Sequence, residues 1–249
     1  MLYFTLKQRF QWKKMDFDPS ELEDLLALYD KYAGDLKSVR EAQKKFYSEG
    51  KQWGLRPQLG DMEAEITYLR VREEKPANVV EFSPASGWST SWILHALKDN
   101  GSGMLHSFDL VDKSRSVVDA GLADGRWKLY VGDVTKSLHL FPKDATYLFV
   151  DSDHTGPFAE WYIREVFPLF PKGTKASAHD ILKYRYQPGC GQESEVLCRW
   201  LAENRKKCAT ASRALKNLGY DRVLGKKKNL GLGEPIHPAD FNSMVFFEL

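Results

Sequence analysis

The amino-acid sequence predicts an α/β protein in which helices cover both faces of a mostly parallel sheet. Three observations predict this fold class. Segments with the pattern of a strand alternate with segments with the pattern of a helix from residue 78 onward. The first of these strands runs into a turn of small residues that leads directly into a helix. Five predicted strand ends carry an acidic residue each. Such alternation is typical of parallel strands joined by right-handed crossovers.

The length and composition of the chain fit one ordinary globular protein. Its 249 residues can bury one substantial core and a helical extension. The net charge of +2 gives no overall field that would favour nucleic acid or an anionic membrane. The three cysteines lack C-x-x-C spacing, which argues against a zinc knuckle and against a disulfide scaffold. No run approaches the roughly 18 apolar residues of a membrane span, and we expect a cytoplasmic protein.

The first 75 residues precede the sheet and are predicted to be helical. Residues 19–48 carry two apolar stripes at helical spacing, and another helix is predicted over 61–74. We therefore expect a helical cap over 1–75 and the main domain over 76–249. The two stripes must be buried either over a ligand cleft or against a second subunit, which leaves a homodimer open.

Strands and helices alternate through the main domain. Strands are predicted over 78–82, 104–109, 127–131, 146–151 and 175–180, and helices over 88–99, 113–121, 156–169 and 192–217. Two further strands, near 220–224 and 243–249, have only a loop between them, so the last strand can insert antiparallel. The sequence thus predicts a Rossmann-like sheet of seven strands, mostly parallel, with an antiparallel last strand.

The segment 78–90, NVVEFSPASGWST, holds the most informative turn of the chain. Its apolar strand passes through Glu81 into a turn of small residues from Ser83 to Gly87, and a helix follows. A turn of small residues lets a ligand approach the backbone, and the N–H groups of the helix's first turn point at that ligand. Nucleotide-like cofactors use such a site, although the full G-x-G-x-x-G spacing is absent.

Acidic residues gather where the predicted strands end. Ligands of open α/β sheets lie beyond the carboxyl ends of the strands. The acidic residues at those ends are Glu81, Asp109, Asp133, Asp151 and Asp180. Any single one has a simple explanation as a loop acid or a helix N-cap, but five at one edge indicate a site.

With these motifs the chain resembles class I S-adenosylmethionine-dependent methyltransferases. It is most similar to the small-molecule and sugar O-methyltransferases related to catechol O-methyltransferase. The resemblance covers about residues 58–249 and rests on VVEFSPASGWST, SFDL, GDVT, LFVDSDHT and AHDI, followed by the terminal FFEL strand. It implies S-adenosyl-L-methionine as the cofactor and a small-molecule or carbohydrate acceptor.

The resemblance also implies which residues hold the cofactor. Asp109 would bind the ribose hydroxyls, and Asp133 would lie near the adenine. The residues implied for the methionine portion are Glu81, Ser83, Ala85, Gly87, Ser89 and Thr90. Ser83 departs from the family, which usually has its first glycine at this position, and a serine there has less backbone freedom.

The acceptor end of the site is expected at the fourth strand end, in Asp151-Ser152-Asp153-His154-Thr155. A histidine titrates near neutral pH, so His154 is a candidate to take the proton from an acceptor hydroxyl as the methyl group is transferred. Asp151 and His179 are further candidate catalytic residues. The alternative is that His154 caps the helix that starts near Pro157.

A divalent cation such as Mg²⁺ or Mn²⁺ is the second question that the resemblance raises. Metal-dependent relatives use an acid at the fourth strand end and an Asp-Asn, Asp-Asp or Glu-Asp pair at the fifth. Asp151 and Asp180 match this pattern, whereas His179 departs from it. A set of Asp151, His179 and Asp180 would suit Mn²⁺ better than an all-oxygen Mg²⁺ site. Alternatively, His179 is itself the base and no metal takes part.

Transfer of a methyl group to a hydroxyl of a small molecule or sugar is the favoured interpretation. An RNA or nucleotide methyltransferase would show a basic stripe with aromatic residues, which the scattered lysines do not form. A nicotinamide-dependent oxidoreductase needs a glycine fingerprint and predicts no antiparallel last strand. A non-catalytic binding module of the same fold is the remaining alternative. We expect residues 183–193 and the N-terminal helices to line and cap the acceptor pocket.

Overall fold

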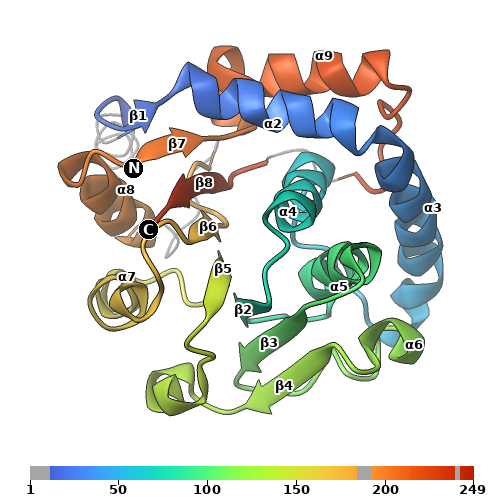
Figure 1. Cartoon of the computed structure of the whole chain (residues 1–249), viewed down its shortest axis with the longest axis horizontal. Helices are drawn as coiled ribbons and strands as arrows, with labels where there is room; N and C mark the ends of the chain where they lie inside the picture. The colour runs from blue at the N-terminus through green and yellow to red at the C-terminus, as the bar shows by residue number, and fades with distance from the viewer. Residues whose placement is uncertain (1–11, 184–191, 239–241) are drawn as a thin grey trace.

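The computed structural model describes residues 12–183, 192–238 and 242–249, and one mixed sheet runs through it (Figure 1). The strands lie in the order β1-β7-β8-β6-β5-β2-β3-β4. Their bounds are β1 Asp16–Phe17, β2 Asn78–Phe82, β3 Met104–Asp109, β4 Trp127–Val131, β5 Ala145–Val150, β6 Lys175–Ala178, β7 Lys207–Ala209 and β8 Val245–Glu248. The chain runs outward from β2 to β4 and then returns to the other side of β2 with β5. This reversal of strand order is where ligands bind in open α/β sheets.

The strand directions confirm a mostly parallel sheet with an antiparallel last strand. The pairs β2–β3, β3–β4, β2–β5, β5–β6 and β1–β7 are parallel. Strand β8 runs antiparallel to both of its neighbours, β6 and β7. The two-residue strand β1 is an eighth strand that was not predicted.

The prediction of a strand near 220–224 is wrong. Those residues lead into a helix, Asp221–Asn229, in which Val223 and Lys227 are buried one helical turn apart. Five residues with one apolar face fit either a strand or a helix, and here the helical spacing decided. The missing strand is β7, Lys207–Ala209, which the prediction had placed inside a helix over 192–217. That helix ends at Glu203, and Arg205 has a left-handed backbone with φ of 50°.

Eight α-helices surround the sheet in the described residues. They are α2 Pro19–Lys31, α3 Ala33–Gly50, α4 Asp61–Glu74, α5 Trp88–Asn100, α6 Ala120–Ala123, α7 Gly156–Trp161, α8 Gln192–Glu203 and α9 Asp221–Asn229. Short 3₁₀ helices cover Lys51–Trp53, Val134–Lys136, Leu138–Leu140, Phe167–Leu169 and Arg213–Leu215, and π-helical segments cover Tyr162–Val166 and Lys216–Tyr220. The predicted helix over 113–121 is therefore reduced to the short α6.

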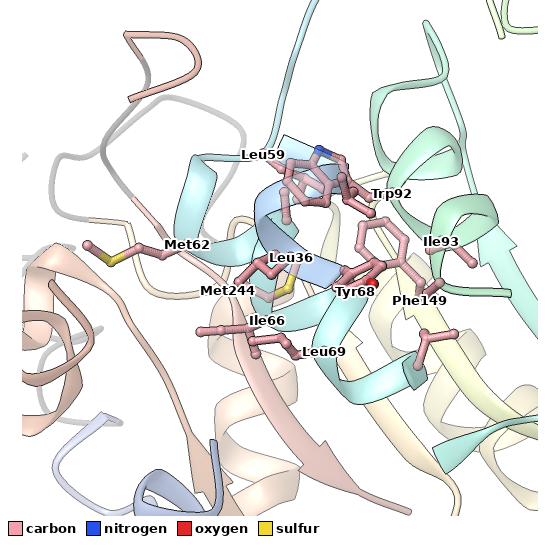
Figure 2. Packing of buried hydrophobic residues seen from close by; sticks show 14 of the residues in the cluster. Leu36, Leu59, Met62, Ile66, Tyr68, Leu69, Trp92, Ile93, Phe149 and Met244 are labelled. Atoms are coloured by element: carbon pink, nitrogen blue, oxygen red, sulfur yellow. The ribbon is translucent and has the colours of Figure 1, made fainter. Parts of the chain in front are cut away.

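The two faces of the sheet bury two separate cores, because successive residues of a strand point to opposite faces. Val79 belongs to the core beneath α2, α3, α4, α5 and α9, while Val80 belongs to the core beneath α7 and α8. Figure 2 shows side chains of the first core, with Tyr68 of α4 and Trp92 of α5 close to Phe149 of β5. The rings of Tyr68 and Trp92 pack edge to face, with 6.4 Å between their centroids. Helices on both faces confirm the predicted fold class.

The apolar stripes of the N-terminal helices are buried within this chain. Leu22 and Tyr29 of α2 and Leu36 and Val39 of α3 all lie in the core that includes the sheet residue Val79. A second subunit is therefore not needed to cover them, although a homodimer and the boundary between residues 75 and 76 stay predictions. In the described ranges, no helix combines the length and the apolar character that crossing a membrane requires.

Candidate active site

Four strand ends lie side by side at one edge of the sheet. Phe82 at the end of β2 is in register with Phe108 of β3 and Val150 of β5, and Val150 is in register with Ala178 of β6. The residues that follow these positions therefore share one edge. They are Ser83, Asp109, Asp151 and His179, and every predicted site residue except Asp133, which follows β4, lies in or next to these positions.

Glu81 sits at the centre of a buried network of hydroxyl groups. Its carboxylate accepts hydrogen bonds from Ser107 Oγ at 2.5 Å, Ser89 Oγ at 2.7 Å and Thr90 Oγ1 at 2.9 Å. Burial raises the pKa of Glu81 to about 7, although the three hydroxyls favour its charged form. The network ties β2 to β3 and to the first turn of α5. Glu81, Ser89 and Thr90 thus hold one another in place beneath the turn.

The turn after β2 is held in an unusual backbone conformation. Ser83, Ala85 and Gly87 have φ values of 58°, 47° and 89°, in the left-handed region. Only glycine fits the last position, because a Cβ there would lie 2.4 Å from Cγ2 of Val118. The Ala85 N–H donates to Oδ2 of Asp109 at 3.0 Å, which fixes the turn to the end of β3.

Apolar side chains lie exposed beside Asp109. Leu110 is 71% exposed, and Val131 at the end of β4 is 54% exposed. Asp109 pairs with Val131 in the register of β3 and β4, so Leu110 and Val131 both lie next to Asp109 at the edge of the sheet. Leu110 and Val131 were not predicted as site residues. Leu110 could have been identified from the sequence, because it is an apolar residue directly after the acid that ends a strand.

Asp133 lies at the same edge and caps a short helix. Its carboxylate accepts hydrogen bonds from the backbone N–H and the hydroxyl of Thr135, at 2.9 and 2.7 Å. The Thr135 hydroxyl is the main cause that lowers the pKa of Asp133. Asp133 is therefore the N-cap of the 3₁₀ helix Val134–Lys136. Its role near the adenine stays a prediction.

His154 is oriented by a buried carboxylate from another element. Its Nδ1 lies 2.7 Å from Oε2 of Glu193, a buried residue in the first turn of α8. Its Nε2 lies 3.5 Å from Oδ2 of Asp180 and 3.8 Å from Oδ1 of Asp151. Burial alone would lower the pKa of His154, but Glu193 and the two aspartates raise it above its usual value. The helix α7 is capped by Thr155, so the alternative of a cap at His154 is wrong.

His179 is buried between carboxylates on both sides of its ring. Nδ1 lies 3.1 Å from Oδ1 of Asp151, and Nε2 lies 3.5 Å from Oε2 of Glu63 in α4. Burial opposes the charged ring, yet Asp151, Asp180 and Glu63 together raise the pKa of His179 well above its usual value. The Glu63 carboxylate also accepts hydrogen bonds from the backbone N–H groups of Gly60 and Met244, both at 2.7 Å. The N-terminal helices thus contribute a carboxylate to the site.

Asp180 is held by a lysine and a serine. Lys183 Nζ lies 2.7 Å from Oδ2, and Ser243 Oγ donates to Oδ1 at 2.9 Å. Burial would raise the pKa of Asp180, but His179 and Lys183 lower it to about 2, so the carboxylate is charged. Across the described part of the chain, no group of three or more His, Cys, Asp or Glu side chains is arranged to hold a metal ion. The assignment of Asp151, His179 and Asp180 as ligands of a divalent cation stays a prediction.

Comparison with known proteins identifies the part of the chain that carries this edge. The family described as "Methyltransferase domain" matches residues 80–181. Residues 80–181 form a methyltransferase domain. All the predicted site residues, from Glu81 to Asp180, lie inside it, and the predicted kinship is confirmed at the level of this domain and of the fold.

Solved structures place the methyltransferase domain in its fold class. An O-methyltransferase from Bacillus cereus, solved in complex with SAH, matches with a TM-score of 0.55 and 12% identity, over 92% of this chain and 99% of that one. The O-methyltransferase TomG from Streptomyces achromogenes, involved in tomaymycin synthesis and solved with SAM, matches with a TM-score of 0.51 and 13% identity, over 87% and 89%. Identities this low establish the fold alone. A search of curated proteins finds no match.

Three residues of the methyltransferase edge were not predicted. They are Glu63, Glu193 and Lys183, which come from α4, α8 and the loop after β6; Lys183 and Glu193 lie at the ends of the predicted pocket segment, but no charged role was predicted for them. Residues 183–193 were expected to line a pocket, but 184–191 lie outside the described residues. What can be described is a charged cluster in which His154 has one nitrogen fixed and the other directed at the carboxylates of Asp151 and Asp180.

Proposed function

We propose that this chain is an S-adenosylmethionine-dependent O-methyltransferase that acts on a hydroxyl of a small molecule or sugar. One observation carries the proposal: the turn after β2 and the imidazole–carboxylate cluster adjoin at one edge. Ser83 Oγ of the turn donates to Ser152 Oγ at 2.9 Å, and Ser152 lies between Asp151 and His154 in the chain. A cofactor bound at the turn would therefore end beside the cluster.

The edge at β2, β3 and β4 suits the nucleoside part of the cofactor. A ribose has two neighbouring hydroxyls that a carboxylate such as Asp109 can accept. The exposed side chains of Leu110 and Val131 provide apolar surface for a purine base. S-adenosylmethionine would supply a methyl group made electrophilic by its sulfonium centre.

His154 is better placed than His179 to accept the acceptor's proton. Both rings have carboxylates near both nitrogens, but the side chain of His179 is only 5% exposed. His154 is 21% exposed and has only Nδ1 at hydrogen-bond distance from a carboxylate, that of Glu193. Nε2 of His154 can thus bind the hydroxyl of an acceptor. In this proposal His179 keeps Asp151 in place, and Asp151 faces the protonated ring of His154.

Two measurements test the proposal. Calorimetry should detect binding of S-adenosylhomocysteine, and NAD should not bind. An assay of S-adenosylhomocysteine release should then detect turnover on at least one member of a panel of catechols, phenolic acids, monosaccharides and polyols. A panel of nucleosides and short RNAs serves as the contrast. Turnover confined to nucleosides or RNA, or the absence of S-adenosylhomocysteine binding, would contradict the proposal.

A further inference from the structure

We propose that the ammonium group of Lys183 takes the place that a divalent metal ion would have at the acceptor end of the site. Its Nζ lies 2.7 Å from Oδ2 of Asp180, and the two side chains are 15% and 23% exposed. Lysine is among the residue types that are least often buried. The inference rests on the proposed function, because it states how the acceptor oxygen is activated there.

The three residues that the sequence offered as metal ligands already have partners within the chain. Oδ2 of Asp180 forms an ion pair with Lys183, and Oδ1 accepts a hydrogen bond from Ser243. Asp151 Oδ1 is bonded to Nδ1 of His179, and Nε2 of that ring faces Glu63. Because a carboxylate only accepts, Nδ1 of His179 donates its hydrogen to Asp151 and has no lone pair to offer to an ion. A resident cation would have to displace all of these contacts.

Lys183 and His154 approach the same carboxylate oxygen. Nζ of Lys183 lies 2.7 Å from Oδ2 of Asp180, and Nε2 of His154 lies 3.5 Å from it. An acceptor hydroxyl bound to Nε2 therefore lies near a fixed positive charge. A positive group placed where negative charge develops stabilises the transition state, as a metal ion would.

The transfer balances without a metal or any further reactant. The O–H bond of the acceptor breaks, and its proton moves to Nε2 of His154. The oxygen keeps the electron pair, beside the Lys183 ammonium, and uses it to bond to the methyl carbon. The carbon–sulfur bond breaks with its electrons left on sulfur, which becomes a neutral thioether.

Mn²⁺ titration of the full chain tests this inference without knowledge of the acceptor. Protein freed of metal by a chelator is titrated with Mn²⁺ and followed by electron paramagnetic resonance and calorimetry. The wild type should bind no Mn²⁺ below millimolar concentrations. Lys183→Met should bind Mn²⁺ more than about tenfold more tightly, because a unit positive charge near Asp180 is gone. Lys175→Met is the matched control, since Lys175 pairs with Glu248 at the opposite end of β6.

The outcomes separate this inference from the proposed function. Saturable Mn²⁺ binding by the wild type that is lost in Asp151→Asn overturns the inference, and so does a Lys183→Met variant that behaves like Lys175→Met. If Lys183→Met does not fold, the wild-type titration alone still tests the inference. S-adenosylhomocysteine binding is measured on each protein in parallel. Its absence in the wild type counts against the proposed function, whatever the Mn²⁺ titrations give.

Discussion

The two halves of the sheet edge hold their carboxylates in different ways. At the ends of β2 and β3, which we call the cofactor half, Glu81 accepts hydrogen bonds from three hydroxyls. At the ends of β5 and β6, the acceptor half, Asp151 and Asp180 lie among His154, His179 and Lys183. The hydroxyl groups hold the Glu81 side chain in place without adding charge. Imidazole and ammonium partners, in contrast, can carry charge and move protons. The difference indicates a scaffold in the first half and chemistry in the second.

The strongest test of the comparison is the removal of the proton acceptor. We expect His154→Ala to lower the rate of methyl transfer by about 10² to 10⁴, the usual contribution of a positioned base. Binding of S-adenosylhomocysteine should change little, because the cofactor half is intact. Turnover is measured with the acceptor found in the panel, and affinity is measured by calorimetry. His139→Ala, at an exposed position in the 3₁₀ helix Leu138–Leu140, is the control.

A variant at Glu193 sharpens the same test through the pKa of His154. Glu193 raises that pKa, so Glu193→Gln should lower it, and the ring should lose its proton at a lower pH than in the wild type. Nuclear magnetic resonance of protein labelled at histidine reports this pKa without an acceptor. If the pKa in Glu193→Gln equals that of the wild type, Glu193 is not what orients and charges His154.

The next largest effect is expected at Glu81, and it depends on pH. The pKa of Glu81 is raised from 4.5 to about 7 by burial, so its contribution to stability is full below pH 4.5 and is lost as pH rises through 7. Glu81→Gln removes this ionisation. Relative to the wild type, the variant should gain about 3 kcal/mol in the free energy of unfolding between pH 4.5 and pH 8.

Urea unfolding at several pH values measures this difference. Glu49→Gln, on the exposed end of α3, is the control and should show no such trend. A stability difference between wild type and Glu81→Gln that does not vary with pH would mean that Glu81 is charged throughout. The cofactor half would then hold charge as the acceptor half does, and the comparison would fail.

Asp109 tests whether the cofactor half binds a ligand or only supports the turn. Asp109→Ala should weaken S-adenosylhomocysteine binding by about 1 to 3 kcal/mol, the scale of a hydrogen bond to a charged group. Asp112→Ala, in the same loop, should not, since Asp112 pairs with Arg115 at the surface. Calorimetry gives both values. Equal affinities for the two variants would leave Asp109 with a structural role only, as the acceptor of hydrogen bonds from the N–H groups of Ala85 and Val111.

The arrangement of the residues in the cofactor half could be predicted because they are close in sequence. Glu81, the small-residue turn and Asp109 belong to one strand–helix–strand unit, so the order of residues reveals their arrangement. The acceptor half could be predicted only in part. Asp151, His154 and Asp180 follow strand ends, but Glu63 and Glu193 reach the site through the packing of α4 and α8. No local pattern reports a contact of that kind.

Short elements were the other source of error. Strand β7 has three residues, too few for an alternating pattern to show, and it exists because it pairs with β1 and β8. The helix over 221–229 was misread for the same reason, since its first five residues fit either period. The order of the long strands and helices, in contrast, was predicted correctly because each buries a full apolar face.

The smallest expected effect concerns the link between the two halves. Ser83 and Ala85 both have left-handed backbones, so replacement of either by glycine relieves a strain of about 1 kcal/mol and raises the entropy of the unfolded chain similarly. These terms nearly cancel when the two variants are compared. Ser83→Gly alone loses the hydrogen bond to Ser152, so it should be less stable than Ala85→Gly by about 1 kcal/mol. Thermal unfolding of both variants measures the difference, and equal stabilities would show that the serine pair does not couple the two halves.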